Sequence, residues 1–343
     1  MWITKMGSER LALFTRLLVA GAMVLITVPA AAQLRFKSPR VALEQGMAAF
    51  RAGNFELAIP ALQRARDQQV FPARYYLARI YADNDNRYTD HGKAFLLLRQ
   101  FVDQNADIDP ADHHRARRVA AALVRLAKYV RDGVPAIGVR PDVVRAVEYF
   151  HHSATFFNDE NAQFELAKLR LTGEGLRKSV PIALHWLANL SRKGHPGAQA
   201  FLADLYWRGK YIKRNQVKAL ALINVAIENA SQEDRVWIED IHQNIFCGAT
   251  IGTRQAVSGL VATWRNKYGR TRSRHGEDAL SSLNASPVRV CANGETVQRI
   301  EAGPLTAGSE NRGSSNSGNV QFQYGATGKS YRNVQGRDVN KGD

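Results

Sequence analysis

The sequence has 343 residues and carries 47 lysines and arginines against 31 aspartates and glutamates, a formal net charge of +16. A chain of this length can bury a substantial apolar core without disulfides or metal, and its two cysteines lack the CxxC or HxxxH spacing of a zinc site. The basic residues are scattered along the chain, which argues against a nucleic-acid interface and favours anionic envelope polymers, phospholipid headgroups or an acidic protein surface as the counter-charge.

The first 32 residues have the pattern of a secretory signal. Lys5, Arg10 and Arg16 precede an apolar run, residues 17–28, which is followed by PAAAQ. The run is shorter than the stretch of about 20 apolar residues that crosses a bilayer, so cleavage after Ala32 is favoured over an uncleaved membrane anchor. We therefore expect an exported protein with no membrane-spanning segment after cleavage.

One short element recurs along the chain at intervals typical of helical repeats. It reads LARIY, LAKYV, LAKLR and LADLY, and its copies begin at residues 77, 126, 166 and 202. A second amphipathic stretch follows each copy and carries an alanine 17 or 20 residues after the first leucine: Ala94, Ala146, Ala183 and Ala219. Apolar residues recur at three and four positions, which predicts a repeated helix, turn, helix unit in which the Leu-Ala pair and the later alanine face the packing.

Turn residues separate the two helices of each unit. Gly133, Gly173, Gly175 and Gly209 occupy this place in three units, where a left-handed glycine can end a helix. Asn84 and Asn86 occupy it in the first of the four units. The pattern predicts an all-α solenoid of helical hairpins.

The flanking segments set the expected domain boundaries. A further hairpin is predicted upstream at 41–51 and 55–68, and two helices downstream, 233–246 and 254–267, are expected to cap the last repeat because a terminal repeat has no neighbour to cover it. We expect the following organisation: a signal peptide at 1–32, helical repeats at 40–230, capping helices at 231–268 and a low-complexity, largely disordered tail at 269–343.

The tail is rich in Gly, Ser, Asn and Arg, and too poor in apolar residues to order itself. Its alternating stretch 320–324 is a candidate strand for a partner's sheet edge, although an unstructured tail is the favoured interpretation. Cys247 and Cys291 are expected to form a disulfide in an oxidising compartment and to hold the start of the tail against the cap.

The search for catalytic or metal chemistry yields no site. Glu148 and His152 stand one helical turn apart, but no third ligand can be nominated, so a surface role is favoured over a metal site. No GxSxG, HExxH or phosphate-binding glycine loop occurs. A catalytic triad assembled from distant residues remains open as a minor alternative, but we expect a non-enzymatic protein without cofactor or metal.

A binding surface is the expected functional feature. If the Leu-Ala pair of each element is packed, the third position faces outward, and a charged residue stands there in all four copies: Arg79, Lys128, Lys168 and Asp204. Three further residues lie one turn earlier on the same side: Tyr76, Arg125 and Glu165. We expect these residues to contact a protein partner, and a merely solvated helix face is the alternative.

The spacing near 36 residues and the pattern AxxxLAxLYxxG followed by KAxxxL resemble the Sel-one-like repeat family, which is related to tetratricopeptide repeats, over residues 40–230. Three stretches, 129–156, 162–175 and 232–250, resemble periplasmic negative regulators of exopolysaccharide production. The first of the four units departs from the pattern because Asp83 to Asn86 replace the glycine turn, and the tail lies outside the resemblance.

This resemblance implies a right-handed solenoid in the periplasm and acid-responsive signalling. It also implies a specific partner, the periplasmic domain of a sensor histidine kinase in a two-component system. The alternative function is an envelope-assembly scaffold that tethers cell-wall or secretion proteins.

Overall fold

The computed structural model describes residues 36–269 and 288–300. The predicted signal peptide and the candidate strand at 320–324 therefore lie outside the described residues. The described ranges contain a short 3-10 turn, η1 (Pro135–Ile137), and these helices: α2 (Pro39–Arg51), α3 (Phe55–Asp67), α4 (Ala73–Ala82), α5 (His91–Asn105), α6 (His113–Asp132), α7 (Val143–Phe156), α8 (Glu160–Thr172), α9 (Val180–Arg192), α10 (Pro196–Arg208), α11 (Gln216–Asn229), α12 (Gln232–Gly248) and α13 (Ile251–Tyr268).

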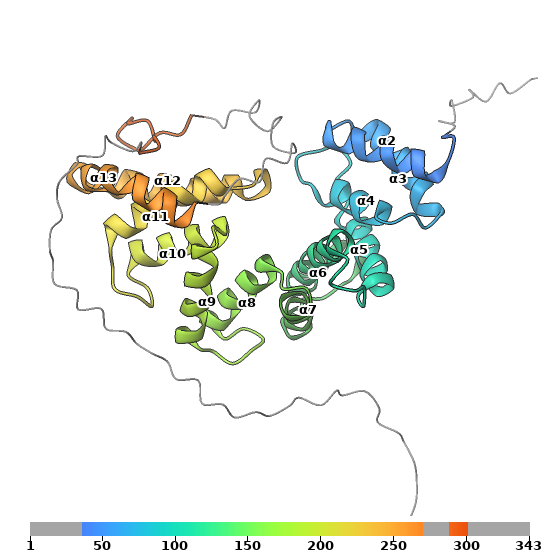
Figure 1. The fold of residues 1–343 in the computed structure, drawn as a ribbon, viewed down its shortest axis with the longest axis horizontal. Coiled ribbons are helices and arrows are strands. Elements are labelled where there is room, and N and C mark those ends of the chain that lie inside the picture. The colour runs from blue at the N-terminus through green and yellow to red at the C-terminus, as the bar shows by residue number, and fades with distance from the viewer. Residues whose placement is uncertain (1–35, 270–287, 301–343) are drawn as a thin grey trace, which may run out of the picture. The chain divides into compact units, whose positions relative to one another are not determined.

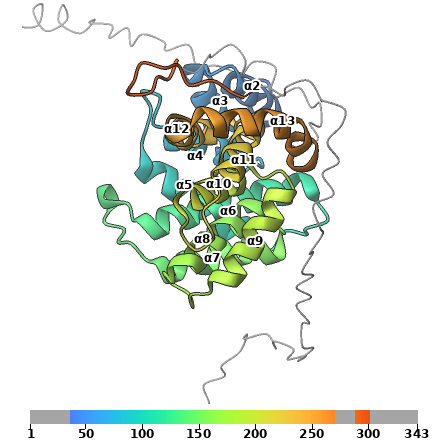
Figure 2. The same ribbon diagram turned by 90° about the vertical axis from the view of Figure 1, so that its left-hand side faces the viewer.

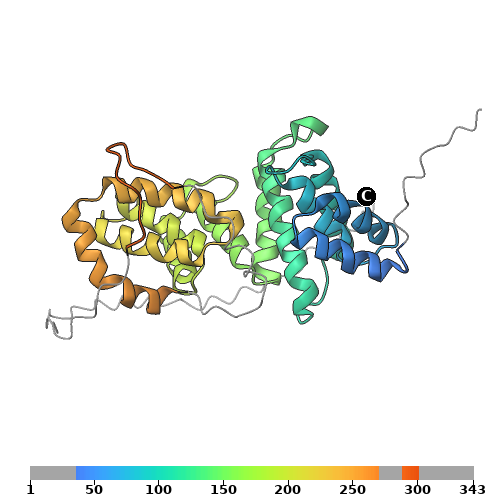
Figure 3. The same cartoon turned by 90° about the horizontal axis from the view of Figure 1, so that it is seen from above.

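Each helix packs against the next one along the chain, from α2 to α12, and this is the packing of a helical-repeat solenoid (Figure 1). Figure 3 shows the helices following one another in chain order. The expected all-α fold of stacked hairpins is thus confirmed, and the elements that repeat the LAxLY wording are helices α4, α6, α8 and α10. No helix in the described ranges combines the length and the apolarity needed to cross a membrane.

The helix ends are fixed by local chemistry. Side chains of Asp90, Asp142 and Asn215 cap the second helix of their units by accepting a backbone N–H from three residues further on. Gly173 and Gly209 end α8 and α10 in the left-handed conformation, as predicted.

Two of the predicted turns are built differently. Gly133 has a positive φ of 77° but a ψ of 169°, so it ends α6 in a positive-φ conformation outside the left-handed helical region, one that essentially only glycine adopts. The chain then forms a bridge between Val134 and Val139 around η1. In the first of the four units the Asn86 side chain ends α4 by donating to the carbonyls of Ile80 and Asp83.

The leucine and alanine of every LAxLY element lie in the core. The alanines at the second position, Ala78, Ala127, Ala167 and Ala203, are fully buried, and their leucine neighbours are at most 7 % exposed. The alanine of each second helix is also fully buried. Small residues at both contacts let the helix axes approach closely, which confirms the packing role assigned to them.

The C-terminal helices cover the last repeat. Residues 219–227 of α11 are buried without a break, because α10, α12 and α13 all pack around this helix (Figure 2). Pairing of α12 and α13 with α11 therefore supplies the covering layer that a terminal repeat lacks.

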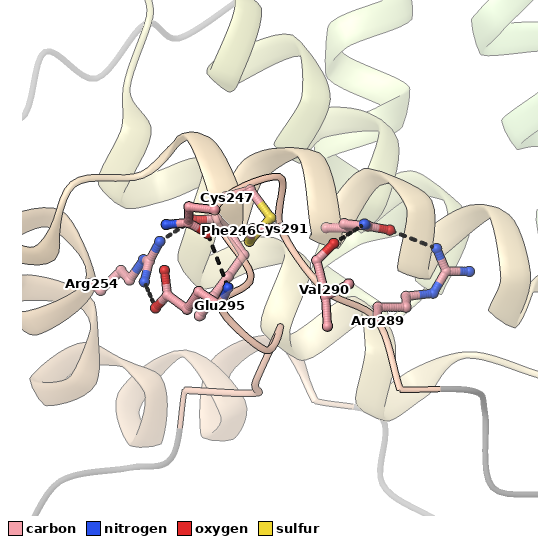
Figure 4. Close-up of a disulfide and its surroundings, with 9 residues drawn as sticks. Phe246, Cys247, Arg254, Arg289, Val290, Cys291 and Glu295 are labelled. Atoms are coloured by element: carbon pink, nitrogen blue, oxygen red, sulfur yellow. Dashed lines mark hydrogen bonds and ion pairs between the residues drawn. A yellow bond between two sulfur atoms is a disulfide. The ribbon is translucent and has the colours of Figure 1, made fainter.

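One part of the tail is held against the cap, the arrangement expected from a bridge between Cys247 and Cys291. Residues 288–300 lie against α12 and α13, with Cys291 Sγ in a disulfide with Cys247 Sγ (Figure 4). Arg289 donates to Asp240, and the Ile300 N–H donates to Asn224 Oδ1 of α11 at 2.9 Å. Polar contacts, the disulfide and the packing of Ile300 against the core hold the segment, so its composition alone does not reveal that it is ordered.

A buried histidine lies beneath this segment. His242 of α12 is 4 % exposed, and its Nε2 has no hydrogen-bond partner among the described residues. Burial, followed by the positive charges of Arg299 and Arg289, lowers the pKa of His242 to about 4. The ring is therefore neutral in the folded protein at neutral and mildly acidic pH.

Acid is expected to destabilise the protein through His242. Its folded pKa lies below the unfolded value of about 6.5, so the unfolded chain binds more protons as the pH falls below that value. The contribution of His242 to the free energy of unfolding is therefore fully present above pH 6.5 and is lost as the pH falls towards 4. Between pH 7.5 and 5.5 the loss is about 1 kcal/mol. Urea unfolding at both pH values should show this loss in the wild type and in the exposed control His113→Gln, but not in His242→Gln. An equal loss in His242→Gln would assign it to other groups.

Candidate functional site

Three cations from two neighbouring repeats surround one buried carboxylate, and we call this group the Glu165 cluster. Glu165 of α8 is only 3 % exposed. Its carboxylate oxygens lie 2.8 Å from Lys168 Nζ, 3.2 Å from Arg131 Nη1 and 3.5 Å from Lys128 Nζ. Helices α6 and α8 present these residues, and both begin a repeat unit, so the cluster joins the first helices of adjacent repeats.

The electrostatics of the cluster leave it positive. Burial would raise the pKa of Glu165, but Lys168, Lys128 and Arg131 outweigh it and hold that pKa below its usual value, so the carboxylate is ionised. Burial, with repulsion from Lys128 and Arg131, lowers the pKa of Lys168 despite its contact with Glu165. Asp132 also pairs with Arg131, at 2.7 Å, so two carboxylates face three cations, of which Lys128 remains half exposed.

A second ion pair connects α6 to the cap. Arg125 Nη2 donates to Glu233 Oε2 at 2.7 Å, although the two residues are 108 positions apart. Arg79 of α4 and Lys128 act on the same carboxylate at longer range. The guanidinium of Arg79 stacks on the Phe50 ring at 4.9 Å from its centroid, which orients it beside this pair.

The seven residues singled out in the sequence divide into groups. Lys128, Lys168 and Glu165 belong to the Glu165 cluster, and Arg125 and Arg79 surround Glu233. Tyr76 packs against Phe50, and its hydroxyl lies 3.5 Å from Arg118 Nε. Asp204 of α10 pairs instead with Arg208 of its own helix.

The expectation that Glu165 faces outward is wrong. Its side chain lies on the expected side of α8, but the three cations cover it. Sequence reasoning also missed Arg131 and Glu233. Arg131 lies one turn after Lys128, a spacing that could have indicated it. Glu233 belongs to the cap, and no local pattern relates it to α6.

No group of three or more histidine, cysteine, aspartate or glutamate side chains in the described ranges is arranged to hold a metal ion. His152, the candidate considered in the sequence, faces the carbonyl of Ala106 at 3.1 Å and stacks on Phe156. Cations outnumber the carboxylates of the site, and an excess of positive charge attracts carboxylates or phosphates rather than metals.

The packing of first helices with buried Leu-Ala pairs defines an α-helical repeat protein. Residues 120–155, 161–195 and 196–231 match the Sel1 repeat, so α6 to α11 form three such repeats.

Two curated proteins are similar to about two thirds of this chain. An exopolysaccharide production negative regulator of Rhizobium leguminosarum bv. viciae is 29 % identical over 215 residues, which are 63 % of this chain and 78 % of the relative. An exopolysaccharide production negative regulator of Rhizobium meliloti is 27 % identical over 229 residues, 67 % of this chain and 83 % of the relative.

Two solved structures also match. A protective antigen of uropathogenic Escherichia coli with an SLR fold gives a TM-score of 0.40 at 19 % identity. The match covers 74 % of this chain and 57 % of the antigen's chain. A Sel1 repeat protein from Oxalobacter formigenes gives a TM-score of 0.42 at 18 % identity and covers 80 % of this chain and 99 % of its own.

Proposed function

We propose that this chain is a periplasmic protein-binding regulator that restrains exopolysaccharide production by holding the extracytoplasmic domain of a sensor histidine kinase inactive. The observation that carries the proposal is the excess of positive charge where the first helices of adjacent repeats meet, around Glu165 and Arg125. The two rhizobial relatives, both named as negative regulators of exopolysaccharide production, support the regulatory part.

Binding explains this surface better than catalysis does. Lys128 is exposed and Arg79 half-buried on successive first helices, and neither is held by a close carboxylate of its own helix in the part of the chain that is described. Complementary charge across an interface attracts a partner and fixes its register. A regulator that restrains a kinase needs such a surface and no reacting group.

Neutralising this surface should weaken partner capture. We expect the double variant Arg79→Gln, Lys128→Gln to capture the partner from detergent-solubilised membranes about tenfold less well than the mature wild type, because each glutamine removes an interfacial attraction. Binding of the purified kinase periplasmic domain, measured by calorimetry, should fall in parallel. A host that carries the double variant should also produce more exopolysaccharide.

The matched control is Arg140→Gln, Arg177→Gln, which removes two exposed cations elsewhere. The control should behave as wild type in all three measurements. Capture of an envelope protein other than a kinase, with unchanged exopolysaccharide on deletion of the gene, would replace the proposal with the scaffold function.

A further inference from the structure

Glu165 and Glu233 both bind cations of α6, but the structure holds them in different ways. The Glu165 side chain is 4 % exposed and has three cation partners, so it is part of the interior. The Glu233 side chain is 60 % exposed, whereas its partner Arg125 is 23 % exposed. Glu233 therefore reaches a largely buried guanidinium from the solvent side.

Helix α12 does not depend on this ion pair for its position. It packs on α10 and α11, and its first turn is closed locally, where Ser231 caps the Asp234 N–H and Trp237 Nε1 donates to Asp234. An ion pair with one partner this exposed is weak. Glu233 can thus leave Arg125 without loss of the helix that carries it.

The positive charges around Glu233 are arranged for a carboxylate. Burial would raise the pKa of Glu233, but Arg125, Arg79 and Lys128 lower it below its usual value. A partly buried guanidinium that loses its anion is left with an unpaired charge, so an incoming anion is favoured in its place. These three cations come from α4 and α6, two different repeat units, and a single extended acidic segment can contact all of them.

We propose that the surface formed by Arg79, Arg125 and Lys128 is the docking site for an acidic segment of a protein partner, and that Glu233 occupies the place of a partner carboxylate in the unbound chain. The inference rests on the proposed protein-binding function and specifies the chemistry of the partner. Docking of such a segment displaces Glu233 from Arg125, so the first turn of α12 competes with the partner.

The test uses a fluorescein-labelled peptide with six glutamates and its hexaglutamine counterpart, with binding to the mature chain followed by fluorescence anisotropy at low salt. Glu233→Gln should bind the glutamate peptide about fivefold more tightly than wild type, because removal of the internal competitor raises the binding-competent fraction. Glu148→Gln, which removes one exposed carboxylate of α7, controls for the change in net charge and should leave the affinity unchanged.

Arg125→Gln distinguishes the site from general attraction. In this background Glu233→Gln should change the affinity much less, because the direct partner of Glu233 is absent and only the longer-range charges of Arg79 and Lys128 remain. Equal gains from Glu233→Gln and Glu148→Gln, or tighter binding to phosphatidylglycerol vesicles than to the peptide, would overturn the inference. If the wild type and Glu233→Gln capture the partner equally well, Glu233 does not compete with the partner. The proposed regulatory function would then still stand.

Discussion

Replacing Lys168 by glutamate is expected to lower the free energy of unfolding by about 3–5 kcal/mol, because it removes one partner of a buried ion pair and places a second carboxylate beside it. Lys168 Nζ lies 2.8 Å from Glu165 Oε2, and the Glu165 side chain is 4 % exposed. Arg131 and Lys128 remain, but they cannot neutralise two adjacent negative charges as fully as three cations neutralise one.

Urea unfolding at neutral pH measures this effect, and two variants sharpen it. Adding Glu165→Gln to Lys168→Glu removes the repulsion and should recover most of the lost stability, whereas Arg140→Glu, an exposed reversal on the surface, should cost under about 0.5 kcal/mol. A wild-type unfolding curve for Lys168→Glu would show that Glu165 is hydrated in solution and is not held by these cations.

The expected loss of stability in Lys168→Glu also limits what charge reversal can show about binding. From the sequence alone, reversing Arg79, Lys128 and Lys168 together is expected to abolish partner binding while the fold stays intact. The burial of Glu165 makes that separation invalid, since two of the three residues hold its charge. Neutral substitutions at Arg79 and Lys128 are therefore the sound test of the surface.

The helical hairpins could be predicted because their determinants are local. The determinants of a unit are its Leu-Ala pair, the alanine of its second helix and a turn glycine such as Gly173 or Gly209. They act within one unit, so their spacing along the chain predicts both the helix packing and the position of the turn. The third position of each LAxLY element lies outside the apolar core, but only Lys128 is exposed, and Arg79, Lys168 and Asp204 are half-buried.

The charge pairing could not be predicted because it depends on contacts between units. Whether Glu165 is exposed is decided by cations from α6, and whether Arg125 has a partner is decided by α12. Periodicity places a residue on a face of its own helix but does not say which side chain of another helix covers it. Residues 288–300 illustrate the same limit, since their order depends on α12 and α13.

Removing the bridge between Cys247 and Cys291 should have the other large effect. The two cysteines are separated by 44 residues, and a loop of this length stabilises the folded state by about 4 kcal/mol in the chain-entropy model. We expect Cys247→Ser, Cys291→Ser to lose stability of this order. Residues 288–300 should then become sensitive to protease, because the remaining ion pairs of Arg289 and Arg254 each have an exposed carboxylate partner and are weak.

The helices beneath should survive this loss, because α12 and α13 pack on α11 through their own apolar faces and do not need the segment for that contact. Circular dichroism of the double variant should therefore keep its helical signal while limited proteolysis cuts near residue 288 and urea unfolding shifts to lower concentration. Reduction of the wild type should give the protease sensitivity and the urea unfolding curve of the double variant, whereas reduction of the double variant should change neither. This comparison assigns the effect to the bridge rather than to the serines.

The bridge itself is tested by thiol titration of unfolded, unreduced mature protein. Two titrating thiols there would mean that the segment is held by its polar contacts alone.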